Sequence, residues 1–260
     1  LENAAARITP QTKAIVPVHL YGQCTNMQAV LEFAKIHKLR VVEDTAQAIG
    51  ATCDLGGGDW QHAGTLGDIG TISFYPSKNL GAYGDGGAMA TRNTELAERL
   101  HQIANHGQAK RYYFDRVGVN SRLDSLQAAV LDVKLGYLDS YIAARRQVAG
   151  RYDQAFAELD AITPPFKADY STHVYHQYTI KVKDGRRDAL KDYLRDKGIP
   201  SVVFYPLAVH QQKAYQELAK PGELPVSEQL CQEVLSLPIH TEFDNAQLDY
   251  ICEQVHAFFK

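Results

Sequence analysis

A lysine and an aspartate each follow an apolar run that is typical of a buried strand. Lys78 comes after the run 69–74, and Asp44 comes after the run 39–42, in the polar pair 43–44. The carboxyl ends of strands in an open α/β sheet are where such sheets bind ligands. Partial burial there lowers the pKa of a lysine and favours a role as nucleophile or Schiff-base former. Each residue also has a plainer interpretation, because most lysines after strands are solvated and Asp44 could cap the following turn.

Together, the two residues match the needs of one cofactor. Pyridoxal phosphate requires a Schiff-base lysine and a carboxylate that keeps its pyridine nitrogen protonated, so that the ring accepts the electrons of a substrate carbanion. The glycine-rich stretch 81–87 reads G-x-x-G-x-G-G and precedes a strand, so it does not predict a dinucleotide site. Its glycines would let the backbone pass close to a bulky group beside Lys78.

Alternating strand and helix patterns predict the elements that position these residues. We expect strands at 14–20, 39–42, 69–74 and 87–91, and helices from about residue 26 and over 93–106, the latter with Leu96, Leu100 and Ile103 inward. This alternation favours a mostly parallel sheet covered by helices. A long helix over 137–159 stops at a double proline, which predicts a large domain over 1–163 and a smaller α+β domain over 164–260.

Composition excludes several classes of protein. The 260 residues carry 27 Lys+Arg against 30 Asp+Glu, a net charge of −3 that argues against a nucleic-acid partner. No apolar run approaches the roughly 20 residues of a membrane span, and no secretory signal opens the sequence. The four cysteines form no C-x-x-C pair, so we expect no metal site and reduced thiols in a cytoplasmic protein.

The motifs around Lys78 and Asp44 resemble a known family. Residues 43–51 and 67–81 look like the nucleotide-sugar aminotransferases of the DegT/DnrJ/EryC/StrS type, and the resemblance extends to residues 18–22, 118–124, 126–129, 205–207 and 235–238. The resemblance implies a fold-type-I, aspartate-aminotransferase-like pyridoxal 5′-phosphate enzyme. It also implies a homodimer with active sites at the subunit interface. Because the cofactor lysine comes much later in that family, it further implies that a segment of the large domain is missing before residue 1.

The resemblance assigns roles residue by residue. Lys78 matches the lysine that carries the cofactor, Asp44 the partner of the pyridine nitrogen, and Gln47 a residue beside the ring and its 3′-hydroxyl. Ser73 matches a phosphate contact, and Asn120 a residue that reaches the phosphate from the neighbouring subunit.

Substrate contacts are expected from four further residues, which are His19, Tyr75, Arg122 and His210. Arg122 could equally be an interface contact. For the two histidines, a hydrogen-bonded scaffold role is an equal alternative.

The implied activity moves an amino group from an amino acid, L-glutamate by resemblance, to a ketone on the sugar of a nucleoside diphosphate. The sequence of residues 67–85 is more similar to the 3-amino-sugar branch of the family than to the 4-amino-sugar branch. Alternatives are a keto-cyclitol or other ketone as acceptor, and a catalytically inactive scaffold or sensory domain. A lysine at position 78 argues against the family's dehydratase variant.

Overall fold

The computed structural model describes residues 1–217 and 220–260, which pack into two units. The first unit contains residues 1–143 and 167–176, and the second contains 144–166 and 177–260. By packing, the chain therefore changes unit within helix α5 (Leu138–Phe156) and returns briefly to the first unit after the double proline. The division into domains after residue 163 stays a prediction.

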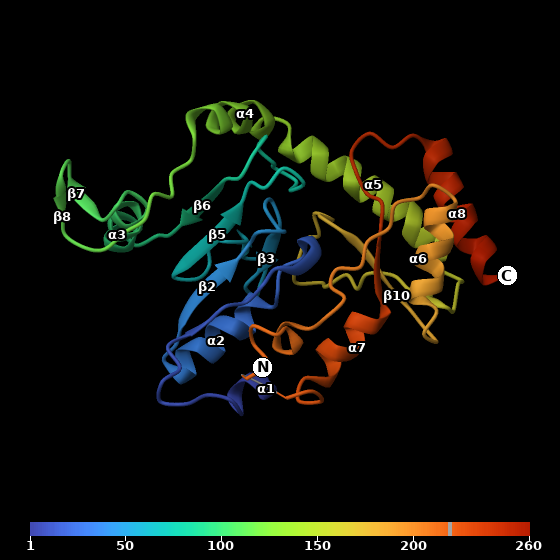
Figure 1. Cartoon of the computed structure of the whole chain (residues 1–260), viewed down its shortest axis with the longest axis horizontal. Coiled ribbons are helices and arrows are strands. Elements are labelled where there is room, and N and C mark those ends of the chain that lie inside the picture. Colours follow the sequence, from blue (N-terminus) through green and yellow to red (C-terminus); the bar gives the residue numbers. More distant parts are fainter. Residues whose placement is uncertain (218–219) are drawn as a thin grey trace. The chain divides into compact units, whose positions relative to one another are not determined.

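The first unit is built on a four-stranded sheet in the order β1-β2-β5-β6 (Figure 1). Its strands are β1 (Ala14–Ile15), β2 (Arg40–Asp44), β5 (Ile69–Ser73) and β6 (Gly87–Ala90). The first three run parallel, and β6 is antiparallel to β5. The mostly parallel sheet predicted from the sequence is thereby confirmed. Its register pairs Asp44 with Thr71, which brings the carboxyl ends of β2 and β5 side by side.

Helix α2 (Met27–His37) shows why the local sequence folds as predicted. The side chain of Asn26 accepts a hydrogen bond from Ala29 N and caps its first turn. Met27, Val30 and Ala34 are buried at helical spacing, in one core with Val41 of β2. The helix is followed by Lys38 in the left-handed region, at φ 55°.

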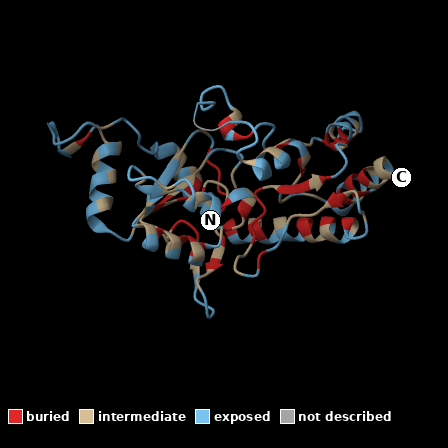
Figure 2. Ribbon diagram, turned by 90° about the horizontal axis from the view of Figure 1, so that it is seen from below, coloured by how far each residue is buried: buried red, intermediate tan, exposed pale blue. Residues whose placement is uncertain are grey.

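The other elements of the first unit are short or exposed. They are α1 (Glu2–Ala5), the 3-10 turn η1 (Leu20–Gly22), α3 (Thr94–Ala104), α4 (Ser125–Leu135), and the hairpins β3 (Thr52–Asp54) with β4 (Trp60–His62) and β7 (Gln108–Lys110) with β8 (Tyr113–Phe114). Helix α3 corrects one expectation, because none of its residues is buried and Ile103 is 41% exposed. Figure 2 shows that α3 and the β7–β8 hairpin are largely exposed.

The second unit is a small α+β assembly. Its antiparallel sheet has the order β11-β10-β9, with β9 (Ile162–Thr163), β10 (Tyr178–Val182) and β11 (Val234–Leu237), and its other elements are α6 (Arg187–Asp196), η2 (Val209–Gln211), α7 (Pro225–Glu233) and α8 (Asn245–Phe259). Tyr152, Phe156 and Tyr178 are fully buried in its core. Near residue 202 the chain forms a single β-bridge, between Val202 and Ser236.

Within the described ranges, no helix combines the length and the apolar character needed to cross a membrane.

Candidate active site

Asp44 and Lys78 lie at the same edge of the first unit's sheet. Asp44 is the last residue of β2, and Lys78 follows β5 after a short turn in which its backbone N–H donates to Tyr75 O. Partial burial lowers the pKa of the Lys78 amine, and the negative charge of Asp44 offsets part of that effect. The site therefore presents an amine that loses its proton more readily than an ordinary lysine, within electrostatic reach of a carboxylate.

The backbone at Asp44 is fixed by its neighbours. Asp44 N donates to Pro17 O at 2.9 Å, and His19 N donates to Asp44 O at 3.0 Å. On the carboxylate, Oδ1 accepts a 3.0 Å hydrogen bond from Ala46 N. The turn-capping interpretation of Asp44 is thus correct as far as it goes, and it is compatible with a second role because a carboxylate has several acceptor positions.

The loop that carries Lys78 is anchored on both sides of the lysine. Asn79 is buried and donates through Nδ2 to Val174 O at 2.9 Å. Further along, Lys134 Nζ of α4 donates to Gly81 O. At Gly81 a Cβ would lie 2.4 Å from Pro76 O, so the close return of the chain requires glycine there. At Gly81 the close approach is to the chain itself, and an approach to a bulky group beside Lys78 stays a prediction.

Gln47 and Ser73 belong to the same edge of the sheet. Ser73 ends β5, and its Oγ accepts from Tyr75 N at 3.3 Å. Gln47 lies three residues after the end of β2, and its Oε1 accepts from Tyr21 N at 2.6 Å. An amine, a carboxylate, an amide and a hydroxyl therefore gather at the carboxyl ends of two adjacent parallel strands. This donor set fits pyridoxal 5′-phosphate, which needs a lysine, a partner for the ring nitrogen and polar groups for its substituents.

Three of the remaining predicted residues are exposed. Tyr75 is 54% exposed at the turn before Lys78. Asn120 and Arg122 lie on the exposed segment between β8 and α4, where Arg122 Nε donates to Asn120 Oδ1 at 3.0 Å. In the described part of the chain, no side-chain hydrogen bond of these three residues reaches Asp44 or Lys78.

Both predicted histidines are buried and bonded to a glutamate. His19 is fully buried, with Nε2 2.9 Å from Glu43 Oε2 and Nδ1 accepting from Thr25 N at 3.1 Å. His210, in the second unit, lies 2.9 Å from Glu228 Oε1. Because both ring nitrogens of His19 are engaged inside the protein, the geometry favours its scaffold interpretation over substrate contact.

Sequence reasoning missed the importance of Glu43. The signal was present, because the alternation of β2 places Glu43 on the same side as Val41, in a position that an apolar residue would normally occupy. An acidic residue in the inward register of a strand must have partners.

A lysine of lowered pKa beside a carboxylate, at the ends of parallel strands in an α/β sheet, defines the class of enzymes that hold pyridoxal phosphate through a lysine. The chain belongs to the DegT/DnrJ/EryC1/StrS aminotransferase family, whose model matches residues 1–256. Aminotransferases of this family depend on pyridoxal 5′-phosphate, and the fold is the fold-type-I class expected from the sequence.

Three similar proteins illustrate the match. A UDP-N-acetyl-3-dehydro-alpha-D-glucosamine 3-aminotransferase of Acidithiobacillus ferrooxidans is 45% identical over 94% of this chain and 63% of its own length. A protein of Geobacillus stearothermophilus named pleiotropic regulatory protein is 43% identical over 98% of this chain and 68% of its own length. The crystal structure of DesV from S. venezuelae, in complex with a ketimine intermediate, is 40% identical, with a TM-score of 0.93 over 100% of this chain and 68% of that one. The chain thus spans about two thirds of the length of these relatives.

Proposed function

We propose that the protein is a pyridoxal 5′-phosphate-dependent aminotransferase that moves an amino group from L-glutamate to the keto group of a nucleoside-diphosphate sugar. The observation that carries the proposal is the placement of Asp44 and Lys78 at one edge of the sheet, where the charge of Asp44 acts on the Lys78 amine. Family membership supports the same reaction class.

The residues of the site divide the work of transamination. When bound, the cofactor supplies an electron sink for the pair released at the substrate carbon. Lys78 would hold the cofactor and, once free, would take a proton from the Cα of the amino donor; its lowered pKa favours the neutral amine that this role requires. Asp44 would keep a proton on the ring nitrogen, and Gln47 and Ser73 would contact the ring and the phosphate.

The acceptor is proposed to be a 3-keto sugar. The sequence of residues 67–85 favours the 3-amino-sugar branch of the family, and the A. ferrooxidans relative is named for a 3-dehydro UDP-sugar. A keto-cyclitol acceptor remains the alternative that product analysis would distinguish.

A second copy of the chain is the proposed partner, with active sites at the subunit interface and the enzyme in the cytoplasm. Apolar side chains are exposed along the arm formed by α3, β7, β8 and the segment up to α4, namely Ile103, Tyr112, Tyr113, Phe114, Val117, Val119 and Leu123. The segment also carries Asn120, which on this proposal reaches the phosphate held by the other subunit. Exposed apolar surface of this extent is typical of an interface.

One alternative has an observation in its favour. The G. stearothermophilus relative is named as a regulatory protein, so a regulatory role without catalysis is the second candidate. The presence of Lys78, Asp44 and Gln47 in one site argues for catalysis, because a domain without turnover has no need of a reactive amine.

The test is an absorbance titration of the intact protein with pyridoxal 5′-phosphate, followed by excess L-glutamate. We expect a visible band that depends on Lys78 and is lost on adding glutamate. Lys78→Ala should abolish both the band and turnover with a 3-keto UDP-sugar, whereas Lys35→Ala, on the exposed face of α2, should alter neither. A band that ignores glutamate would contradict the proposed donor, and no band would contradict the cofactor assignment.

A further inference from the structure

The carboxylate of Glu43 is buried in the core of the first unit. Its side chain is fully buried, on the same side of β2 as Val41, while Asp44 follows it on the opposite side. A carboxylate in such a place is strongly disfavoured unless hydrogen bonds replace its water.

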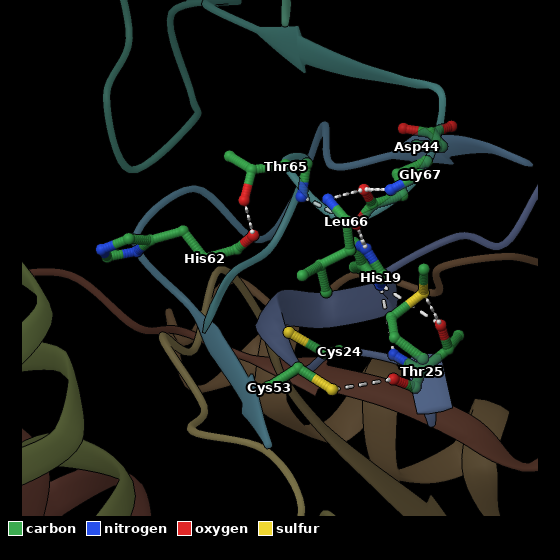
Figure 3. A network of polar contacts seen from close by, with 12 residues as sticks. His19, Cys24, Thr25, Asp44, Cys53, His62, Thr65, Leu66 and Gly67 are labelled. Atoms are coloured by element: carbon green, nitrogen blue, oxygen red, sulfur yellow. Dashed lines mark hydrogen bonds and ion pairs between the residues drawn. The ribbon is translucent and has the colours of Figure 1, made fainter. Parts of the chain in front are cut away.

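Four donors supply those hydrogen bonds. Oε1 accepts from Leu66 N at 2.7 Å and Gly67 N at 2.6 Å, and Oε2 accepts from Gly64 N at 2.8 Å and from His19 at 2.9 Å. These bonds hold the pKa of Glu43 below its ordinary value in spite of its burial, so the side chain stays ionised. Figure 3 shows this network from Leu66 and Gly67 through His19 to Thr25, with Asp44 at its edge.

The hydrogen bonds of His19 fix the direction of its bond to Glu43. His19 Nδ1 accepts from Thr25 N, so the proton of the ring lies on Nε2 and is donated to Glu43. The backbone N–H of the same histidine donates to Asp44 O. One residue therefore binds Glu43 through its side chain and Asp44 through its main chain, which closes a ring of contacts around the end of β2.

The other three donors belong to the turn that leads into β5. Gly64 in this turn packs directly on that strand, since a Cβ on Gly70 would lie 1.9 Å from Gly64 O. The carbonyl of Glu43 accepts from Thr71 Oγ1 at 3.1 Å, so the main chain of Glu43 is tied to β5 as well. Glu43 thus joins the strand that ends in Asp44 to the strand that leads to Lys78.

We propose that Glu43 is a positioning residue of the active site, whose buried carboxylate holds Asp44 at a fixed distance from Lys78. His19 is its partner in this role. The inference rests on the proposed function, in which Asp44 and Lys78 are the working groups.

Glutamine cannot replace Glu43 without conflict. All four partners of the carboxylate are donors, so the amide group of a glutamine would face at least one backbone N–H with another N–H. A tautomer change of His19 offers no relief, because Nδ1–H would then face Thr25 N–H. Glu43→Gln is therefore a sharp test that keeps the size and shape of the side chain.

The experiment measures how strongly Asp44 acts on Lys78 in the intact protein without added cofactor. Competitive acetylation with acetic anhydride, read by mass spectrometry, gives the pKa of the Lys78 amine, with exposed Lys35 as internal reference. Asp44→Asn should lower the pKa of Lys78, because it removes the favourable charge. In a Glu43→Gln background, we expect Asp44→Asn to lower the pKa of Lys78 by about half as much or less, because the two sites are coupled.

A matched control separates positioning from general loss of stability. Asp54 also binds glycine amides through its carboxylate, Gly56 N at 2.9 Å and Gly58 N at 3.1 Å, but in the β3–β4 hairpin. The effect of Asp44→Asn on Lys78 should be unchanged in an Asp54→Asn background. If Glu43→Gln also leaves that effect unchanged while lowering the free energy of unfolding, Glu43 is merely structural and the inference is overturned.

Two further measurements keep the test decisive. If Glu43→Gln fails to fold, His19→Gln, which keeps an amide donor for Glu43, should weaken the effect of Asp44 on Lys78 in the same direction; no change would overturn the inference. The dissociation constant for pyridoxal 5′-phosphate should rise about tenfold in Glu43→Gln, a scale typical of groups that orient a ligand's direct contacts. Failure of the unsubstituted protein to bind the cofactor would contradict the proposed function alone, because the acetylation experiment still decides the role of Glu43.

Discussion

The side-chain amide of Asn79 donates a 2.9 Å hydrogen bond to the carbonyl of Val174, and this bond ties the loop that carries Lys78 to the segment 167–176. Both residues are buried, so the carbonyl has no access to water that could replace the bond. The position of the reactive lysine therefore depends on a contact between residues 95 positions apart in the sequence.

Asn79→Ala removes this bond and leaves the Val174 carbonyl without its partner. We expect the free energy of unfolding to fall by about 1–3 kcal/mol, the usual effect of leaving a buried polar group unsatisfied. Chemical denaturation measures it, with Asn3→Ala on exposed helix α1 as the control. Equal stability of the two variants would show that the bond contributes nothing.

Because of Lys78, the stability of the protein should depend on pH in the alkaline range. The folded protein lowers the pKa of this amine from the value of 10.5 that holds for the unfolded chain. At pH values between the folded-state pKa and 10.5, the unfolded state binds more protons than the folded state, so stability rises with pH in this range. Below the folded-state pKa, the full cost of burying the charged amine lowers stability. Lys78→Met should thus be more stable than the unsubstituted protein at neutral pH, and the difference should shrink toward pH 10.5.

Thermal unfolding at a series of pH values measures that difference. Lys35→Met serves as the matched substitution of an exposed lysine and should show no such trend. A difference for Lys78→Met that stays constant with pH would contradict the lowered pKa.

Much of this site could be predicted because it follows from local rules. Strand ends carry Asp44, Ser73 and Lys78, and the carboxyl ends of parallel strands must meet at one edge. The start of α2 near residue 26 was likewise predictable from the local pattern.

What the sequence alone did not reveal depends on contacts between distant segments. The donors to Glu43 are the ring of His19 and the backbone N–H groups of residues 64, 66 and 67, and backbone N–H groups cannot be recognised from residue type. Helix α3 shows the opposite case. The sequence predicted the helix and its apolar face, but Ile103 on that face is exposed. A periodic pattern predicts an apolar face, but not that this chain itself covers it.

The exposed arm gives a prediction about self-association. Val117 is 96% exposed and is flanked by the exposed Phe114 and Val119. If a second copy covers this surface, Val117→Asp should weaken the dimer about tenfold or more, because a charge would be buried without a partner. Sedimentation equilibrium measures the change, and Val226→Asp, a 68% exposed valine of α7, is the control. Equal association of both variants would remove the arm from the interface.

Substitution of Asp44 should affect mainly catalysis, and substitution of Asp68 mainly stability. Asp44→Asn keeps an oxygen that can accept from Ala46 N but removes the charge that acts on Lys78 and on the ring nitrogen. We expect kcat to fall about 100-fold or more, which is the scale for losing one preorganised electrostatic group. The free energy of unfolding should stay within about 1 kcal/mol of that of the unsubstituted protein.

Asp68 lies at the start of the strands, where its carboxylate accepts from Val41 N at 2.8 Å and from Arg40 at 3.0 Å. Asp68→Ala should lower stability by about 1–3 kcal/mol and leave kcat nearly unchanged, because it removes the acceptor of the backbone N–H of the buried Val41. Steady-state kinetics and denaturation of both variants test this reversal, and a similar loss of kcat in the two would show that Asp44 acts only through the fold.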